Sequence, residues 1–329
     1  MKCFLNIIFL IILLTANIVL AVERVKLAQT GMQFLSVTSD ARAAGMGRSV
    51  TTFEMQSSSL FYNPAGIAGQ LSLFDISISR NNWIAGIYYN AISLSIAPAH
   101  GRYGVFGISL LTVNYGDVQG TVRADNEQGY LKTEMLKPTA YSIGLGYARS
   151  LTDKFSVGGH VKIVHQNLGK SVSTFSDSTL AYSENKITPV AFDFGTRFRT
   201  GFKSLIFGMS VRNFSPEVKY VSESFQLPLE FSIGVSMNAF DFIGEAEYHS
   251  LLLSLDAVHY RSHPEQINMG MEYTFREMIL LRFGYRSGNN ENNVNFGFGL
   301  QYSEFAIDYA YTPFGVFNDV QRFTIRFSL

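Results

Sequence analysis

The chain has 329 residues, and its 26 basic residues balance 26 acidic ones, which gives a formal net charge of zero. This balance excludes the strongly basic surface that nucleic-acid partners require. Charged residues make up 16% of the chain and aromatic residues 14%, whereas a typical soluble domain carries about a quarter charged residues, so an ordinary soluble domain is disfavoured.

Residues 1–21 have the pattern of a secretory signal peptide. Lys2 precedes an apolar run over 4–20, and small or apolar residues lead to a cleavage position after Ala21. An uncleaved anchor helix is the alternative. Cys3 precedes the apolar run, so it cannot become a lipidated N-terminus, and the mature chain would contain no cysteine. No later stretch is apolar over the roughly 20 residues that a spanning helix needs.

The next segment, residues 22–68, lacks the alternation of a strand. We expect a short helix over 30–37, an extended piece over 41–52 and a serine-capped helical turn over 57–62. Asn63-Pro64 and Gly66 then force a turn, because a residue before proline avoids the α region and glycine permits a positive φ. The segment is therefore either a simple connector or a folded element of its own.

From residue 69 to 329 the chain is a succession of short segments in which apolar residues alternate with small or polar ones. Residues 141–148, for example, read Tyr-Ser-Ile-Gly-Leu-Gly-Tyr-Ala. We expect strands near 71–80, 84–96, 102–116, 137–149, 154–168, 187–199, 203–213, 229–238, 249–260, 265–274, 278–287, 292–301, 305–313 and 322–329. The predicted fold is all-β, a transmembrane antiparallel β-barrel of about 14 strands with an N-terminal plug segment.

The polar faces suit a hydrated or plugged interior, since they are rich in glycine, serine and alanine with scattered charges of both signs. A barrel of this size has more interior than its own side chains fill, which favours residues 22–68 as a plug in which Arg42 and Arg48 meet carboxylates. The last strand can pair with the first and leave no open edge, as lipid requires.

The three longest connections, about 117–136, 170–186 and 214–228, all follow odd-numbered strands. Outer-membrane barrels have long outer loops and short periplasmic turns, so we expect these three outside the cell and the N-terminus in the periplasm. The predicted location is an outer membrane of the Gram-negative type, where lipid and lipopolysaccharide surround the barrel.

The sequence carries no motif for catalysis, a cofactor or a metal, and we expect no enzyme. His160 and His165 fall on opposite faces of one strand, and His259 and His263 flank a short turn, so no nucleophile and base are brought together. Acidic residues of the outer connections form either a calcium site or a solvated face: Asp117, Asp125, Glu127, Asp177 and Glu184.

Part of the N-terminal segment resembles the signature of the PorV/PorQ family, whose members are barrels related to the FadL fatty-acid transporters. The stretches are Gln33-Phe34-Leu35, Ala41-Arg42-Ala43-Ala44-Gly45-Met46-Gly47 and Ser58-Ser59-Leu60-Phe61-Tyr62-Asn63-Pro64-Ala65-Gly66. The motif residues carried over are Arg42, Gly45, Gly47, Asn63, Pro64, Ala65 and Gly66. Arg48 and the run Thr52–Gln56 depart from the usual pattern, which has a glycine and more acidic residues there.

The resemblance implies one of two functions. In the first, the barrel binds or hands over exported proteins in type IX secretion, with aromatic residues of the outer connections as contacts. These residues are Phe175, Tyr182, Tyr220 and Phe225. In the second, it transports a hydrophobic small molecule. Strand 102–116 supports this reading, because Val105, Leu111 and Val113 give it an apolar second face that could line a cavity.

Overall fold

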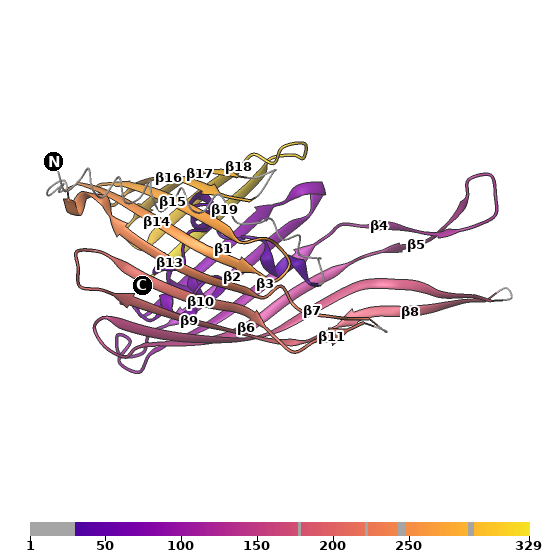
Figure 1. The fold of residues 1–329 in the computed structure, drawn as a ribbon, viewed down its shortest axis with the longest axis horizontal. Helices are drawn as coiled ribbons and strands as arrows, with labels where there is room; N and C mark the ends of the chain where they lie inside the picture. Colours follow the sequence, from indigo (N-terminus) through magenta and orange to yellow (C-terminus); the bar gives the residue numbers. More distant parts are fainter. Residues whose placement is uncertain (1–29, 177–178, 221–222, 243–247, 289–292) are drawn as a thin grey trace.

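The computed structural model describes residues 30–176, 179–220, 223–242, 248–288 and 293–329, and side chains except those of 171–182. The predicted signal peptide, 1–21, lies outside these residues. Fourteen strands form a closed antiparallel barrel in which β19 returns to pair with β1, as Figure 1 shows. Ile78 of β1 lies opposite Ile325 of β19, so no edge is left open to lipid.

All fourteen expected strands are confirmed. Their bounds are β1 (Phe74–Asn82), β2 (Tyr88–Ile96), β3 (Val105–Asn114), β6 (Thr139–Ser150), β7 (Phe155–Ser176), β9 (Val190–Arg199), β10 (Ile206–Phe214), β13 (Glu230–Asn238), β14 (His249–Tyr260), β15 (Gln266–Phe275), β16 (Ile279–Arg286), β17 (Val294–Tyr302), β18 (Phe305–Thr312) and β19 (Val320–Ser328). Most ends differ from the expected ones by a few residues, and β7 extends furthest beyond them.

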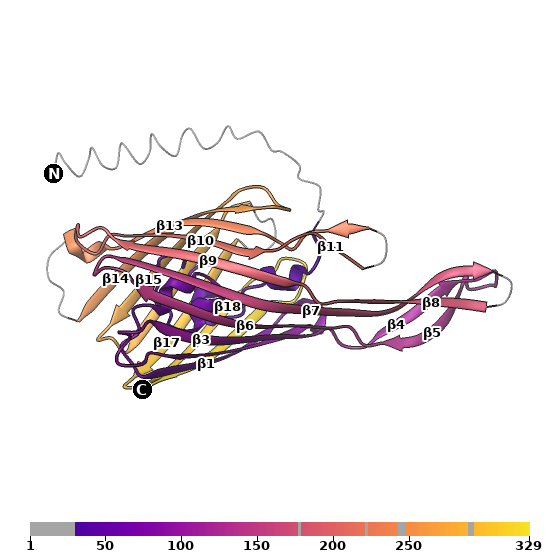
Figure 2. The same cartoon turned by 90° about the horizontal axis from the view of Figure 1, so that it is seen from below.

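The connections expected as loops contain further strands, which is a correction. β4 (Val118–Arg123) and β5 (Tyr130–Leu136) form one hairpin, and β8 (Thr179–Ile187) pairs with the outer part of β7. β11 (Val218–Lys219) and β12 (Ser224–Phe225) form a third, minimal hairpin. Figures 1 and 2 show the hairpins β4–β5 and β7–β8 projecting from one end of the barrel. We call this the hairpin end and the opposite one the turn end.

The apolar face of each wall strand points outward. On β6, Tyr141, Ile143 and Leu145 are exposed, while Ser142 between the first two is buried. A soluble sandwich would show the reverse, because its apolar face packs inward. The outward apolar band is the surface that lipid requires, and the inward polar face must be satisfied inside the barrel.

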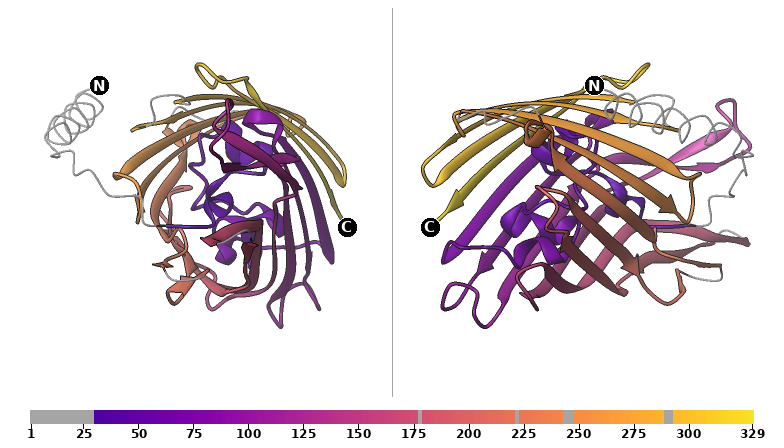
Figure 3. Two further views of the ribbon diagram at one scale, coloured as in Figure 1. Left: turned by 90° about the vertical axis from the view of Figure 1, so that its right-hand side faces the viewer. Right: turned by 60° about the vertical axis from the view of Figure 1, so that its left-hand side comes forward.

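The N-terminal segment, residues 30–70, lies within the ring of strands, as Figure 3 shows. Its elements are η2 (Gln33–Ser36), α2 (Ala41–Gly45), η3 (Gln56–Phe61) and η4 (Pro64–Ile67). None of the helices formed by the described residues is long and apolar enough to cross a membrane.

Two expectations for this segment were wrong. Residues 41–52 do not begin as an extended piece, because the Asp40 carboxylate accepts a hydrogen bond of 2.9 Å from the amide of Ala43 and caps α2. The turn near 57–62 forms, but η3 has no side-chain cap. Instead, the Ser59 hydroxyl accepts from the amide of Met55 at 2.9 Å.

Candidate functional site: the interior and mouth of the barrel

Arg42 ties the N-terminal segment to the wall. Its guanidinium donates to both carboxylate oxygens of Glu272 on β15, at 2.9 and 2.6 Å. Glu272 also accepts from Arg282 on β16 at 2.5 Å, and Arg282 donates to Asp308 on β18 at 2.5 Å. Because an unpaired buried charge is costly, this alternation of cations and carboxylates stabilises α2 against the wall.

Arg48 forms a second ion pair, with Glu230 on β13. It also donates to the hydroxyl of Tyr260 at 2.9 Å and to the carbonyl of Ser36 at 3.2 Å. Arg212 of β10 shares the same carboxylate at 3.3 Å. Two guanidinium groups therefore meet one carboxylate here, and this part of the interior is locally positive.

The cap of α2 is itself buried. Asp40 is 3% exposed, and its backbone amide donates to the Tyr62 hydroxyl at 3.2 Å. Burial, together with the nearby charge of Asp308, raises the pKa of Asp40 above its usual value. Its carboxylate therefore takes up a proton more readily in the folded chain than in the unfolded one.

The motif glycines lie where two backbones touch. A Cβ on Gly284 of the wall would lie 2.0 Å from the nitrogen of Gly47, whose φ is +59°. A Cβ on Gly45 would lie 2.9 Å from the Cα of Gly297, and one on Gly66 would lie 2.5 Å from a carbonyl oxygen of the same segment. No other residue type permits so close an approach, so Gly45 and Gly47 fit the segment to the wall, and Gly66 allows the segment to pack on itself.

Asn63 joins the segment to the wall through its amide group. The amide donates to the carbonyl oxygens of Thr51 at 2.6 Å and of Thr196 on β9 at 3.1 Å. The dipeptide Pro64-Ala65 then lies against Gly158 of β7, where a Cβ would approach the Ala65 nitrogen to 2.5 Å. These motif residues all have structural contacts inside the barrel.

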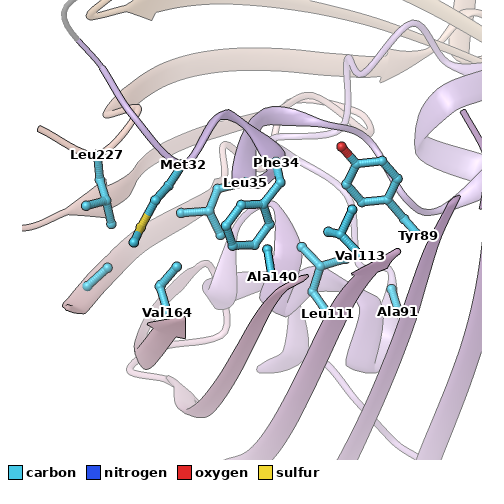
Figure 4. Close-up of a cluster of buried hydrophobic side chains, with 11 residues drawn as sticks. Met32, Phe34, Leu35, Tyr89, Ala91, Leu111, Val113, Ala140, Val164 and Leu227 are labelled. Carbon is cyan, nitrogen blue, oxygen red and sulfur yellow. The ribbon is translucent and has the colours of Figure 1, made fainter. Parts of the chain in front are cut away.

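A cluster of buried apolar side chains joins η2 to the wall. Its members are Met32, Phe34, Leu35, Tyr89, Ala91, Leu111, Val113, Ala140, Val164, Ala191 and Leu227. Figure 4 shows Phe34 and Leu35 lying toward the strands that carry Leu111, Val113 and Ala140. The second apolar face of β3 therefore packs against the N-terminal segment, whereas the sequence suggested that it could line a cavity for a hydrophobic molecule.

A row of three side chains on β3, β7 and β9 was missed from the sequence. Ser109 Oγ lies 2.9 Å from Nε2 of His160, and Nδ1 of His160 lies 2.8 Å from Asp193. A nucleophile, a base and an orienting carboxylate follow each other in this way in serine hydrolases. However, Ser109 is 2% exposed, and Asp193 also accepts from Lys162 at 2.7 Å. In this conformation the row is a buried polar network that no substrate reaches.

The four aromatic residues that the sequence suggested as partner contacts differ in their surroundings. Tyr220 and Phe225 stack on each other with ring centroids 5.2 Å apart, and the Tyr220 hydroxyl donates to Gln166 at 2.8 Å. They are half-buried at the mouth and do not stand free in solvent. Phe175 and Tyr182 lie within 171–182, whose side chains are outside the described part of the chain.

The acidic residues of the outer connections do not form a metal site within the described residues, where no three potential ligands come together. Glu184 pairs instead with Lys186 at 2.5 Å. Asp177 lies outside the described residues.

A cavity of about 500 Å³ lies between the N-terminal segment and the wall at the hairpin end. Phe34 and Thr38 line it from the segment, and Trp83, Arg286 and Arg322 line it from the wall. We call it the mouth cavity.

The model of the family described as type IX secretion system protein PorV matches residues 21–259. Among solved structures, the chain is similar to the CymD monoaromatic hydrocarbon channel, with 12% identity, 89% of this chain and 98% of that chain covered, and a TM-score of 0.59. The toluene transporter TbuX of Ralstonia pickettii matches with 11% identity, coverage of 90% and 99%, and a TM-score of 0.58. A FadL homologue of Pseudomonas aeruginosa matches with 11% identity, coverage of 88% and 98%, and a TM-score of 0.54. Likeness at such identities shows the fold alone, and no curated protein matches.

Proposed function

The chain belongs to the PorV family of outer-membrane β-barrels, and from this membership we propose that it binds exported proteins through its projecting hairpins during type IX secretion. In this proposal the hairpin end faces the outside of the cell. Residues 22–68 act as the plug of a barrel formed by 69–329. Thr30 and Gly31 contact Gln226 at the hairpin end, so in this orientation the described part of the N-terminal segment starts at the outer mouth, and the periplasmic N-terminus expected from the sequence does not fit it.

The observation that carries the proposal is the length of the hairpins beyond the wall. β7 has 22 residues, whereas a tilted transmembrane strand needs about 9 to 11. At a rise of about 3.3 Å per residue, the surplus of about 11 to 13 residues is roughly 40 Å long, measured along the strand. A projection of this length has no use in closing the barrel, and it suits contact with a large partner (Figure 2).

The β4–β5 hairpin adds exposed apolar surface. Val118, Leu131 and Met135 are 47%, 55% and 51% exposed. These side chains stand on a two-stranded hairpin that pairs with no other described strand, and an isolated hairpin is at best marginally stable in water. Open strand edges and apolar side chains together favour a protein partner that covers them by strand addition or by packing.

The interior supports a sealed barrel. The N-terminal segment occupies it through the ion pairs of Arg42 and Arg48 and through backbone contacts at the wall glycines. A plug held in this way keeps the barrel closed while a partner binds outside.

Transport of a hydrophobic molecule is the second candidate. One observation favours it: an apolar hollow of about 360 Å³ on the wall, with Phe194, Met209 and Phe231 among its lining residues. On the inner side of the same wall, however, Gly158 and Gly195 touch the N-terminal segment. Passage would therefore require the segment to move.

Co-purification tests the first candidate. The tagged barrel is purified in mild detergent from its own cells, and the bound polypeptides are compared with the proteins that the cells export. A variant with a short Gly-Ser turn in place of 119–135 should lose them and keep the heat-modifiable migration of a folded barrel. The control is Arg276→Gly with Glu277→Gly at the turn end, where both residues already have positive φ.

Unchanged binding of exported proteins by the shortened variant would exclude the β4–β5 hairpin as the contact. Saturable binding of toluene to the purified barrel that is lost when Phe194 and Phe231 are replaced by Ala would instead support transport.

A further inference from the structure

The mouth cavity is lined by cationic and aromatic side chains. Arg48, Arg286 and Arg322 supply guanidinium groups, while Phe34, Trp83 and Tyr115 supply aromatic walls. None of the described residues that line the cavity is an aspartate or a glutamate. The surroundings are therefore positive, and they are only partly apolar.

Two of these guanidinium groups form no ion pair with a carboxylate among the described residues. Arg322 is 3% exposed and donates to neutral oxygens, the carbonyl of Thr38 at 2.9 Å and the hydroxyl of Thr312 at 2.8 Å. Its guanidinium lies 5.6 Å from the ring centroid of Trp83. Arg286 interacts with the Tyr260 hydroxyl and with the charge of Glu230, which Arg48 and Arg212 already share, and its Nε has no hydrogen-bond partner among the described residues. Arg48 already pairs with Glu230.

A buried or half-buried guanidinium group that forms no ion pair is costly, and a bound anion would offset that cost. We propose that the mouth cavity binds a small organic carboxylate that carries an aromatic body. The planar fork of a guanidinium matches the two oxygens of a carboxylate, and the aromatic walls take up a flat apolar group. This inference goes beyond partner binding and does not rest on it.

The size of the cavity limits the ligand. At about 30 Å³ for each water-sized group, 500 Å³ holds a ligand of roughly 15 heavy atoms, which is within the range of small-molecule sites. A long-chain amphiphile exceeds this volume. A neutral hydrocarbon fits, but it leaves the guanidinium groups of Arg286 and Arg322 unpaired.

Trp83 provides a local signal, because it is the only tryptophan of the chain and it lines the cavity. The probe is 4-nitrobenzoate, whose nitro group quenches indole fluorescence, titrated into the full chain in detergent. We expect saturable quenching. The uncharged methyl ester of the same acid should bind at least tenfold more weakly.

Two variants separate the ion pairing from mere access to the cavity. Arg286→Gln and Arg322→Gln should each weaken 4-nitrobenzoate binding about tenfold or more, as loss of a charge-assisted hydrogen bond does. Arg276→Gln, an exposed arginine at the turn end, should leave it unchanged. Arg322 also donates a hydrogen bond to Thr38, so heat-modifiable migration is used to check that the Arg322→Gln variant folds. If that variant does not fold, the Arg286→Gln variant tests the proposal, because Arg286 is only half-buried.

Equal affinity for the acid and its methyl ester would overturn the proposal, as would unchanged binding by the folded Arg286→Gln variant. Displacement of the probe by inorganic phosphate at equal concentration would overturn the assignment of a carboxylate. Tighter binding of decanoate than of 4-nitrobenzoate would overturn the assignment of an aromatic body.

Discussion

Arg42 and Glu272 form an ion pair with two hydrogen bonds, at 2.9 and 2.6 Å, between residues 230 positions apart in the chain. One partner belongs to a helix of five residues that could not persist alone, and the other to a wall strand. The pair makes the folding of the N-terminal segment depend on the barrel. It also leaves Glu272 shared between Arg42 and Arg282.

Arg42→Met should destabilise the barrel by about 3 kcal/mol, because breaking a buried pair leaves an under-compensated carboxylate. Replacing both partners, Arg42→Met with Glu272→Met, should cost less than the sum of the single changes. Urea unfolding of the refolded barrel in detergent measures all three variants. Additive losses would mean that the two side chains do not stabilise each other.

Gly284→Ala should be the most damaging of the alanine substitutions in the wall, since the added Cβ would lie 2.0 Å from the nitrogen of Gly47. Relief requires movement of the backbone, and overpacking of this kind costs about 3 kcal/mol. Gly159→Ala is the matched control, because a Cβ there meets nothing nearer than 4.0 Å. Limited proteolysis measures whether the N-terminal segment is released from the barrel. Equal protection of the Gly284→Ala and Gly159→Ala variants from the protease would contradict the close packing of Gly284 against Gly47.

The wall could be predicted from the sequence because lipid outside and polar groups inside impose a strict period of two on every strand. The β4–β5 hairpin could not. Both its faces meet water, so Val118–Arg123 and Tyr130–Leu136 show no alternation between two environments. In the same way, α2 is too short to show a helical period, and its only signal was Asp40 followed by helix-forming alanines.

For the interior contacts, the sequence predicts the type of interaction but not which residues are paired. Arg42 and Arg48 are conspicuous cations in a segment expected inside a barrel, but which carboxylates they meet depends on strand register. The row from Ser109 to Asp193 shows the same limit. His160 and Asp193 lie directly opposite each other on β7 and β9, and this pairing requires the register of both strands. Ser109 is not a cross-strand partner of His160 at all, because β6 lies between β3 and β7.

Ser109 should not react with a fluorophosphonate, although its hydrogen bonds resemble those of a catalytic serine. The hydroxyl is buried, and a nucleophile must be reached by its substrate. Mass spectrometry of the folded barrel after incubation with the reagent should find no adduct. An adduct that disappears in Ser109→Ala would show an opening of the interior and would make the barrel an enzyme candidate.

Asp40→Asn should stabilise the chain at neutral pH. Burial raises the pKa of Asp40 in the folded state, so its contribution to stability is greatest below its unfolded pKa of about 3.9 and is lost as the pH rises through the folded pKa. Asparagine keeps the cap of α2 without the charge. The difference in urea midpoint between Asp40→Asn and the unsubstituted chain should therefore be near zero at pH 3 and should grow in favour of the variant toward pH 7. Asp241→Asn, at a half-buried carboxylate whose pKa is lowered by hydrogen bonds from Ser204, should show the opposite sign. If Asp40→Asn loses stability at neutral pH, the carboxylate charge at the cap is favourable, and burial does not dominate at that position.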